Sequence, residues 1–84
     1  MRRYEVYMHL SLLERVPRRG LARRKVMAFV YSLREHPDTP GDFVEKDTSL
    51  RERQVKIVED YAITYWLDSP VHRVMVVDIR PADK

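Results

Sequence analysis

Three runs of strand-forming residues follow one another between residues 53 and 79, with only short polar breaks between them. Residues 53–58 alternate in polarity, residues 61–67 are rich in β-branched and aromatic side chains, and residues 73–79 are apolar on both faces. Strands joined by such short turns pair in antiparallel fashion. A run that is apolar on both faces is typical of a central strand covered on both sides. This region therefore constrains the fold to a sheet that contains an antiparallel meander.

The residues before this region add a further strand and two helices. Residues 3–10 alternate between apolar and polar side chains, which predicts a strand with one buried side. Residues 12–16 predict a short helical turn that ends before Pro17, and residues 20–36 carry apolar side chains at helical spacing. The apolar positions of this second helix are Ala22, Val26, Phe29, Val30 and Leu33. We expect the two helices to form a hairpin joined by residues 17–20.

These elements define a two-layer α+β domain, because the apolar faces of the helices must pack on one face of the sheet. Residues 43–47 are a further candidate for a short strand at the edge. The expected fold is an N-terminal strand and a helical hairpin packed on a four- to five-stranded, mainly antiparallel sheet. A chain of 84 residues is one domain, so we assign residues 1–84 to it, with residues 81–84 as a loose tail.

The composition excludes several classes of protein. The sequence has no cysteine, which excludes a disulfide scaffold, a thiolate zinc site and a cysteine nucleophile. The three histidines are scattered without ligand spacing, and no glycine-rich phosphate loop is present, so we expect neither a metal nor a cofactor. No apolar run approaches the roughly 20 residues of a membrane span, and no secretory signal is recognisable. We therefore expect a cytoplasmic protein that does not bind membranes.

Positive charge is concentrated in the first part of the chain. The formal net charge is +3, but residues 1–34 hold nine Lys and Arg against two Asp and Glu, whereas residues 35–60 hold four against eight. Six cations gather around the predicted hairpin: Arg15, Arg18, Arg19, Arg23, Arg24 and Lys25. Such a cluster suggests binding to RNA or to an acidic partner, or it is a solvated helix face.

The order of these elements, together with several short motifs, resembles the RelE/ParE superfamily of bacterial type II toxins. The motifs that carry the resemblance are the helix end Leu33-Arg34-Glu35-His36-Pro37, the paired segments Val55-Lys56-Ile57 and Tyr61-Ala62-Ile63-Thr64-Tyr65-Trp66-Leu67-Asp68, and the closing strand at residues 74–79. The resemblance spans most of the chain. It implies the α+β fold already expected, and the role of the toxin in a toxin–antitoxin system.

Members similar to RelE cleave mRNA on the ribosome, so the resemblance implies a metal-independent endoribonuclease. The 2′-hydroxyl attacks the adjacent phosphate in such a reaction, which needs a base, an acid and cations around the phosphorane. Lys56 and Arg80 are the candidate catalytic residues that the resemblance indicates. Lys56 is out of phase with Val55 and Ile57, so it is expected on the outward face of its strand. The alternatives are a solvated strand lysine and an exposed tail arginine.

Binding to RNA or to a protein partner requires further side chains. The candidates are the six cations of the hairpin, Arg53 as a phosphate clamp, and Trp66 as a platform for a base or an interface anchor. Trp66 is out of phase with Tyr65, which we expect to pack in the core. Burial under a partner segment is the alternative for Trp66.

Two other functions stay open. A ParE-like inhibitor of DNA gyrase uses the same scaffold without a catalytic site, and a non-catalytic toxin-fold module binds only a protein partner. Ala62 favours these alternatives, because the family often has an arginine at this position of the strand. In each case the resemblance implies a cognate antitoxin as a partner, in addition to the ribosome and mRNA or to gyrase.

Overall fold

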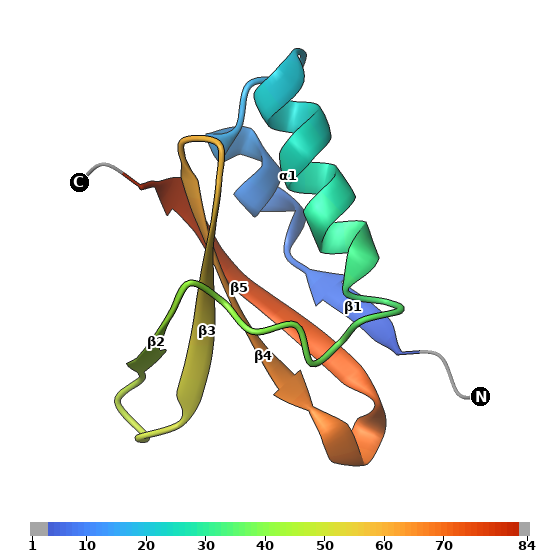
Figure 1. The fold of residues 1–84 in the computed structure, drawn as a ribbon, viewed down its shortest axis with the longest axis vertical. Coiled ribbons are helices and arrows are strands. Elements are labelled where there is room, and N and C mark those ends of the chain that lie inside the picture. Colours follow the sequence, from blue (N-terminus) through green and yellow to red (C-terminus); the bar gives the residue numbers. More distant parts are fainter. Residues whose placement is uncertain (1–3, 83–84) are drawn as a thin grey trace.

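The computed structural model describes residues 4–82 and consists of one helical layer on one sheet (Figure 1). In chain order the elements are β1 (Glu5–Met8), the 3-10 helix η1 (Leu10–Arg15), α1 (Leu21–Ser32), β2 (Phe43–Lys46), β3 (Glu52–Val58), β4 (Tyr61–Asp68), the 3-10 turn η2 (Ser69–Val71) and β5 (Arg73–Pro81). The α+β class predicted from the sequence is confirmed.

The five strands form one mixed sheet in the order β1-β5-β4-β3-β2. The pair of β1 with β5 is parallel, and the other three pairs are antiparallel. Strand β5 is paired along both edges, so its predicted central position is confirmed. The prediction that both of its faces are covered is wrong, because the helical layer lies on one face of the sheet (Figure 1). The short edge strand predicted at residues 43–47 is confirmed as β2. It forms one edge of the sheet, and β1 forms the other edge.

The helical layer covers one face of the sheet, which we call the helix side. Val26, Val30 and Leu33 from α1 and the segment after it pack with Leu12 and Val16 from the η1 region. The predicted hairpin is correct in position, but its first arm is a single 3-10 helix rather than an α-helix. The interval between β1 and Pro17 holds too few residues for a stable α-helix, and short 3-10 helices are common as connectors.

Helix α1 ends four residues before the predicted end at His36. The Ser32 hydroxyl donates a hydrogen bond of 2.6 Å to the carbonyl of Phe29, and residues 33–35 form a turn. Pro37 disfavours helical backbone at the residue before it, so the chain leaves the helix before reaching the proline.

The segment that follows crosses the helix side of the sheet to reach β2 (Figure 1). The Tyr65 hydroxyl donates to the Thr39 carbonyl at 2.8 Å, and the Asp42 amide donates to the Val55 carbonyl at 2.7 Å. At Gly41 a Cβ atom would lie 2.5 Å from the Val55 carbonyl oxygen. The absence of a side chain at Gly41 therefore allows this close approach to β3.

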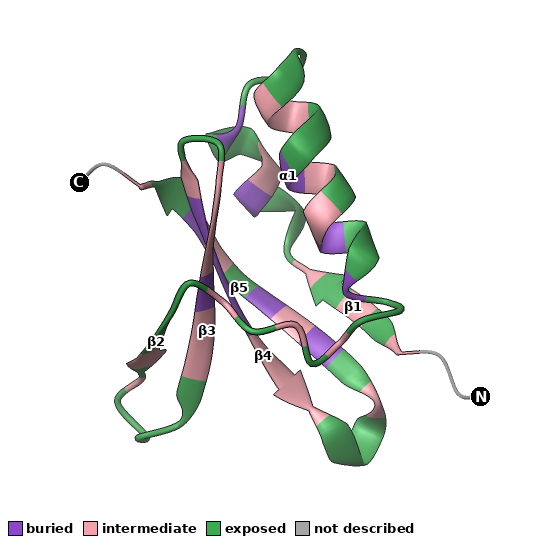
Figure 2. Cartoon of the chain, in the orientation of Figure 1, coloured by how far each residue is buried: buried purple, intermediate pink, exposed green. Residues whose placement is uncertain are grey.

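The pairing of β3 with β4 decides which residues face the helices. Directly opposed residues of antiparallel strands share a face, and successive residues alternate. Lys56 is opposite Ile63, which belongs to the core beneath α1, whereas Val55 is opposite Thr64. The outward position predicted for Lys56 is therefore wrong: Lys56 lies on the helix side. Val55 lies on the other face of the sheet, which we call the open face, and is nonetheless fully buried (Figure 2).

The described chain begins at residue 4 and ends at residue 82. Residue 3 of the predicted first strand and residues 83–84 of the predicted tail lie outside the described residues. Pro81 is the last residue of β5 and pairs with Tyr61, and the Ala82 amide donates to the Asp60 carbonyl at 2.8 Å. Across residues 4–82, no helix has the length and apolar character needed to cross a membrane.

Candidate nucleic-acid interface

A β-bulge places Arg80 on the open face. The register between β4 and β5 shifts between Thr64 and Tyr65, so that Tyr65 is opposite Val76 whereas Thr64 is opposite Asp78. The extra residue on β5 is Val77, which is more exposed than its neighbours. Because a β-bulge adds one residue to a strand, the side chains after it point to the opposite face from the one that regular alternation would give. Asp78 and Arg80 consequently share the open face with Thr64 and Ala62.

Three arginines and two carboxylates form an ion-pair network on this face. Asp78 accepts hydrogen bonds from Arg15 at 2.6 Å and from Arg80 at 2.8 Å. Arg15 also donates to the Ile79 carbonyl at 3.2 Å. The two carboxylate oxygens of Glu45 lie 3.7 Å from the guanidinium nitrogens of Arg80 and Arg53, one each. Arg80 is therefore held firmly by Asp78 and only loosely by Glu45.

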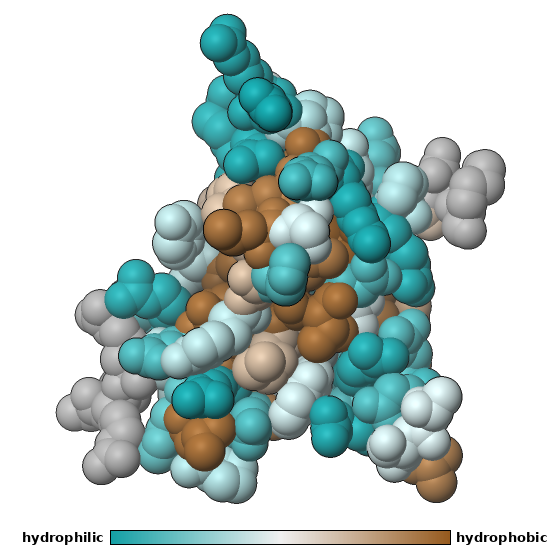
Figure 3. All heavy atoms as spheres, turned by 180° about the vertical axis from the view of Figure 1, so that it is seen from behind, coloured by the Kyte–Doolittle hydropathy of each residue, from teal (hydrophilic) through white to brown (hydrophobic). Residues whose placement is uncertain are grey.

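Small and medium-sized side chains of the open face lie beneath this ion-pair network. The contact of Arg80 with Glu45 joins β5 to β2 and so bridges the two strands between them. Ala62, Thr64 and Val55 on those two strands are buried. Figure 3 views the molecule from the side away from α1 and shows apolar side chains in the middle of this face, with polar side chains around them.

Among residues 4–82, two buried polar side-chain atoms on the open face find no hydrogen-bond partner. They are Oγ1 of Thr64 and Nε of Arg53. Buried polar groups in folded proteins are nearly always paired, so each exception needs an explanation. Both atoms lie on the face that carries the arginine network.

Trp66 also lies on the open face, as its predicted phase requires. Its side chain is half-buried, and the Arg51 guanidinium lies 4.2 Å from the ring centroid. A stacked guanidinium is a cation–π contact that an aromatic base can replace. Arg51 comes from the turn between β2 and β3, so the turn covers the predicted stacking platform.

The six cations predicted around the hairpin do not form one surface. Arg15 joins the open face through Asp78, and Arg23 donates to the Leu13 carbonyl at 3.2 Å, which supports the end of η1. The other four are exposed, and within residues 4–82 they form no ion pair: Arg18, Arg19, Arg24 and Lys25.

Lys56 is separated from the arginines by the sheet itself. Its Nζ atom lies 3.5 Å from a carboxylate oxygen of Asp42, in the segment that crosses the helix side. The other oxygen of Asp42 accepts the Ile57 amide at 2.7 Å. This backbone hydrogen bond, with the charge of Lys56 as a smaller cause, lowers the pKa of Asp42 below its ordinary value. Lys56 is therefore part of a structural contact rather than of the open face.

The open face is equipped to bind anions. Arginine guanidinium groups bind phosphate through paired hydrogen bonds and keep their charge at any physiological pH. Burial raises the pKa of Tyr65 to about 12 and its hydroxyl is occupied by Thr39, so Tyr65 does not serve as a base. Within residues 4–82, no group of three or more His, Asp or Glu side chains lies together in a way that could hold a metal ion.

Sequence reasoning missed Asp78, Glu45 and Arg51 as parts of this site. Asp78 and Arg80 are two residues apart, which places both on one face of a strand and is a readable signal. Glu45 and Arg53 become neighbours only through the pairing of β2 with β3, and the contact of Arg51 with Trp66 depends on the turn conformation.

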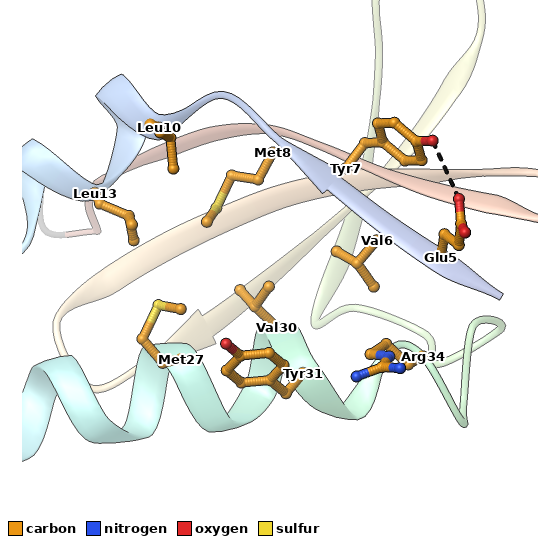
Figure 4. A pocket seen from close by; sticks show the side chains of 10 residues that line it. All are labelled: Glu5, Val6, Tyr7, Met8, Leu10, Leu13, Met27, Val30, Tyr31 and Arg34. Atoms are coloured by element: carbon orange, nitrogen blue, oxygen red, sulfur yellow. Dashed lines mark hydrogen bonds between the residues drawn. The ribbon is translucent and has the colours of Figure 1, made fainter. Parts of the chain in front are cut away.

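A second surface feature is a groove between β1 and α1. It has a volume of about 490 Å³, and Figure 4 shows apolar side chains from both elements facing each other across it. Its lining includes Leu10, which is 76% exposed, and Tyr31, which is 61% exposed. Because β1 is an edge strand, the groove borders backbone groups that have no strand beside them.

The fold is similar to that of a protein whose complex has been solved. The chain matches one in the crystal structure of the archaeal RelE–RelB complex from Pyrococcus horikoshii OT3, with a TM-score of 0.74 over 96% of this chain and 97% of that chain. The two sequences are 16% identical, so the likeness is one of fold. The RelE-like fold inferred from the sequence motifs is thereby confirmed. No protein-family model and no curated protein matches the sequence.

Proposed function

We propose that this protein is the toxin of a toxin–antitoxin pair and that it cleaves RNA on its open face. The observation that carries the proposal is the set of Arg15, Arg53 and Arg80 gathered by one network on the uncovered face of a RelE-like sheet. Single-stranded RNA supplies both phosphates for the arginines and bases for Trp66.

The proposed reaction is attack of a ribose 2′-hydroxyl on the neighbouring phosphate, without a metal. The O2′–P bond forms as the P–O5′ bond breaks, which leaves a 2′,3′-cyclic phosphate and a free 5′-hydroxyl. Water takes the proton of the 2′-hydroxyl and supplies one to the departing 5′-oxygen. In this proposal Arg80 stabilises charge on the phosphorane, and the hydrogen bond from its guanidinium group to Asp78 supports this role. Arg53 is placed to hold a phosphate on the same face. Lys56 has no part in this proposal, since it lies on the helix side.

The proposed antitoxin binds in the groove between β1 and α1. The groove offers exposed apolar side chains beside an unpaired strand edge, a combination suited to an extended or helical peptide. The matching structure is a RelE–RelB complex, which supports a partner of this kind. Arg34 at the end of the groove suits an acidic segment.

A second candidate is a non-catalytic protein that binds partners through the same fold. Two observations favour this candidate. Lys56 and Arg80 lie on opposite faces of the sheet, so they cannot act on one phosphate. Ala62 is buried at a strand position where the family that the sequence resembles often has an arginine. A ParE-like action on DNA gyrase belongs to the same non-catalytic class.

Purified protein with ribosomes and a defined mRNA separates these candidates. The proposed function predicts new mRNA 5′ ends that appear with the wild-type protein and are lost with Arg80→Gln. Intact mRNA with correctly folded wild-type protein would favour the non-catalytic candidate, and a gyrase supercoiling assay would then distinguish its two forms.

A further inference from the structure

Glu45 lies between the guanidinium groups of Arg53 and Arg80. Its two carboxylate oxygens face Arg53 and Arg80 at 3.7 Å each. A carboxylate between two guanidinium groups has the charge and the acceptor oxygens of a phosphodiester. Glu45 comes from the four-residue edge strand β2, whereas the arginines come from β3 and β5.

The two carboxylates of the network differ in how tightly they hold Arg80. Asp78 makes a hydrogen bond of 2.8 Å, and the same carboxylate is also anchored by Arg15 at 2.6 Å. Glu45 is beyond hydrogen-bond distance from both of its arginines. Asp78 therefore positions the Arg80 guanidinium group. Glu45 compensates the charge of Arg80 without accepting a hydrogen bond from its N–H groups.

A phosphate in the place of Glu45 would gain contacts that the carboxylate lacks. Charge-assisted hydrogen bonds to phosphate form at about 2.7–2.9 Å, which is shorter than the 3.7 Å that separates Glu45 from each of its two arginines. Half of the Arg80 side chain and a third of the Glu45 side chain are exposed, so the pair that must separate is a weak one.

We propose that Glu45 is an internal competitor for the phosphate subsite formed by Arg53 and Arg80. The carboxylate occupies the subsite in the free protein and moves aside when a phosphodiester binds. Glu45 thus lowers the affinity of the open face for RNA. This inference rests on the proposed function, since it assigns regulation to the same RNA-binding face.

Binding of a fluorescein-labelled single-stranded RNA oligonucleotide, measured by anisotropy at low salt, tests the proposal. Glu45→Gln is expected to bind about two- to fivefold more tightly than wild type, the range expected for release from an exposed ion pair. Glu52→Gln is the matched control, because it removes the same charge from an exposed residue of the neighbouring strand. It is expected to bind within about 1.5-fold of wild type.

A double variant separates competition from a general change in charge. In the Arg80→Gln background, the gain from Glu45→Gln is expected to shrink to less than half, because one of the two arginines that it releases is gone. Circular dichroism of each variant confirms that it folds.

Two results would overturn the proposal, and they differ in what else they affect. Equal or weaker binding by Glu45→Gln, with weaker binding by Arg80→Gln, refutes competition but leaves the RNA-binding face intact. Wild-type affinity in both Arg53→Gln and Arg80→Gln refutes the competitor and the proposed RNA-binding face together.

Discussion

Lys56 and Arg80 lie on opposite faces of the sheet. Lys56 is opposite Ile63 of the core, and Arg80 is opposite Ala62 on the open face. One bound RNA strand cannot contact both side chains at the same phosphate. The two residues that the family resemblance joins in one catalytic set therefore have separate roles.

Arg80→Gln is expected to weaken binding of single-stranded RNA by about tenfold and to reduce the slope of affinity against salt by about one unit, as for loss of a phosphate contact. Lys56→Gln removes the same charge from the helix side and is expected to leave affinity and slope close to wild type. Anisotropy titrations at several salt concentrations measure both. Equal losses in the two variants would contradict the assignment of faces.

Gly41→Ala is expected to destabilise the fold by about 2–3 kcal/mol, because the new Cβ would meet the Val55 carbonyl at 2.5 Å and backbone must move. Gly20→Ala meets no atom within 4 Å, but its φ of 104° and ψ of −176° lie in a region nearly restricted to glycine, so it also costs about 1–3 kcal/mol. Urea unfolding of both variants measures the losses. Wild-type stability of Gly41→Ala would show that the close approach of Gly41 to β3 is not needed.

The element order was predictable from the sequence because each run has a clear period. The faces of β3 were not, because apolar Val55 and Ile57 suggest a core that lies on the other side of the sheet. Val55 is buried on the open face between its strand partners Phe43 and Thr64. Lys56 is accommodated on the helix side by Asp42. Both effects arise from residues distant in the sequence.

The β-bulge in β5 is a second feature of the site that was not predictable from the sequence. A run that is apolar on both faces is consistent with a regular central strand. Its sequence therefore does not indicate the register shift at Val77. Only that shift places Val76 and Ile79 together in the core and moves Asp78 and Arg80 to the open face. The network with Glu45 then depends on the pairing of β2, which alternation alone does not determine.

Asp42 makes the stability of the fold depend on acid pH. Its pKa is lowered in the folded state from an ordinary value of 3.8. Its contribution is therefore complete above that value and is lost as the pH falls through the lower folded pKa. Asp42→Asn is expected to flatten the fall in unfolding free energy below about pH 4, measured by urea unfolding across pH.

A second variant tests the cause of this pKa shift. The Ile57 amide is the largest cause and Lys56 a smaller one, so Lys56→Gln is expected to keep most of the acid dependence that Asp42→Asn removes. If Lys56→Gln flattened the profile as much as Asp42→Asn, the ion pair rather than the backbone hydrogen bond would be the main cause.

Aspartate in the groove is expected to weaken antitoxin binding. Leu10→Asp and Tyr31→Asp each place a charge on an exposed apolar position of the lining, and each is expected to weaken the complex by at least about tenfold. Leu50→Asp, at an equally exposed position in the turn between β2 and β3, is the control. Calorimetry with the proposed antitoxin, sought as the product of a neighbouring gene, measures the change. Unaltered affinity in both groove variants would place the antitoxin elsewhere.

We propose that the arginines of the open face make this protein an RNA-cleaving toxin. The most direct test is tightly controlled expression in a bacterial host, with growth, protein synthesis and mRNA 5′ ends followed for the wild type, Arg80→Gln and Lys56→Gln. We predict rapid arrest of translation with new 5′ ends for the wild type and Lys56→Gln, and none for Arg80→Gln. Undisturbed growth and intact mRNA in cells that contain folded wild-type protein would contradict the claim.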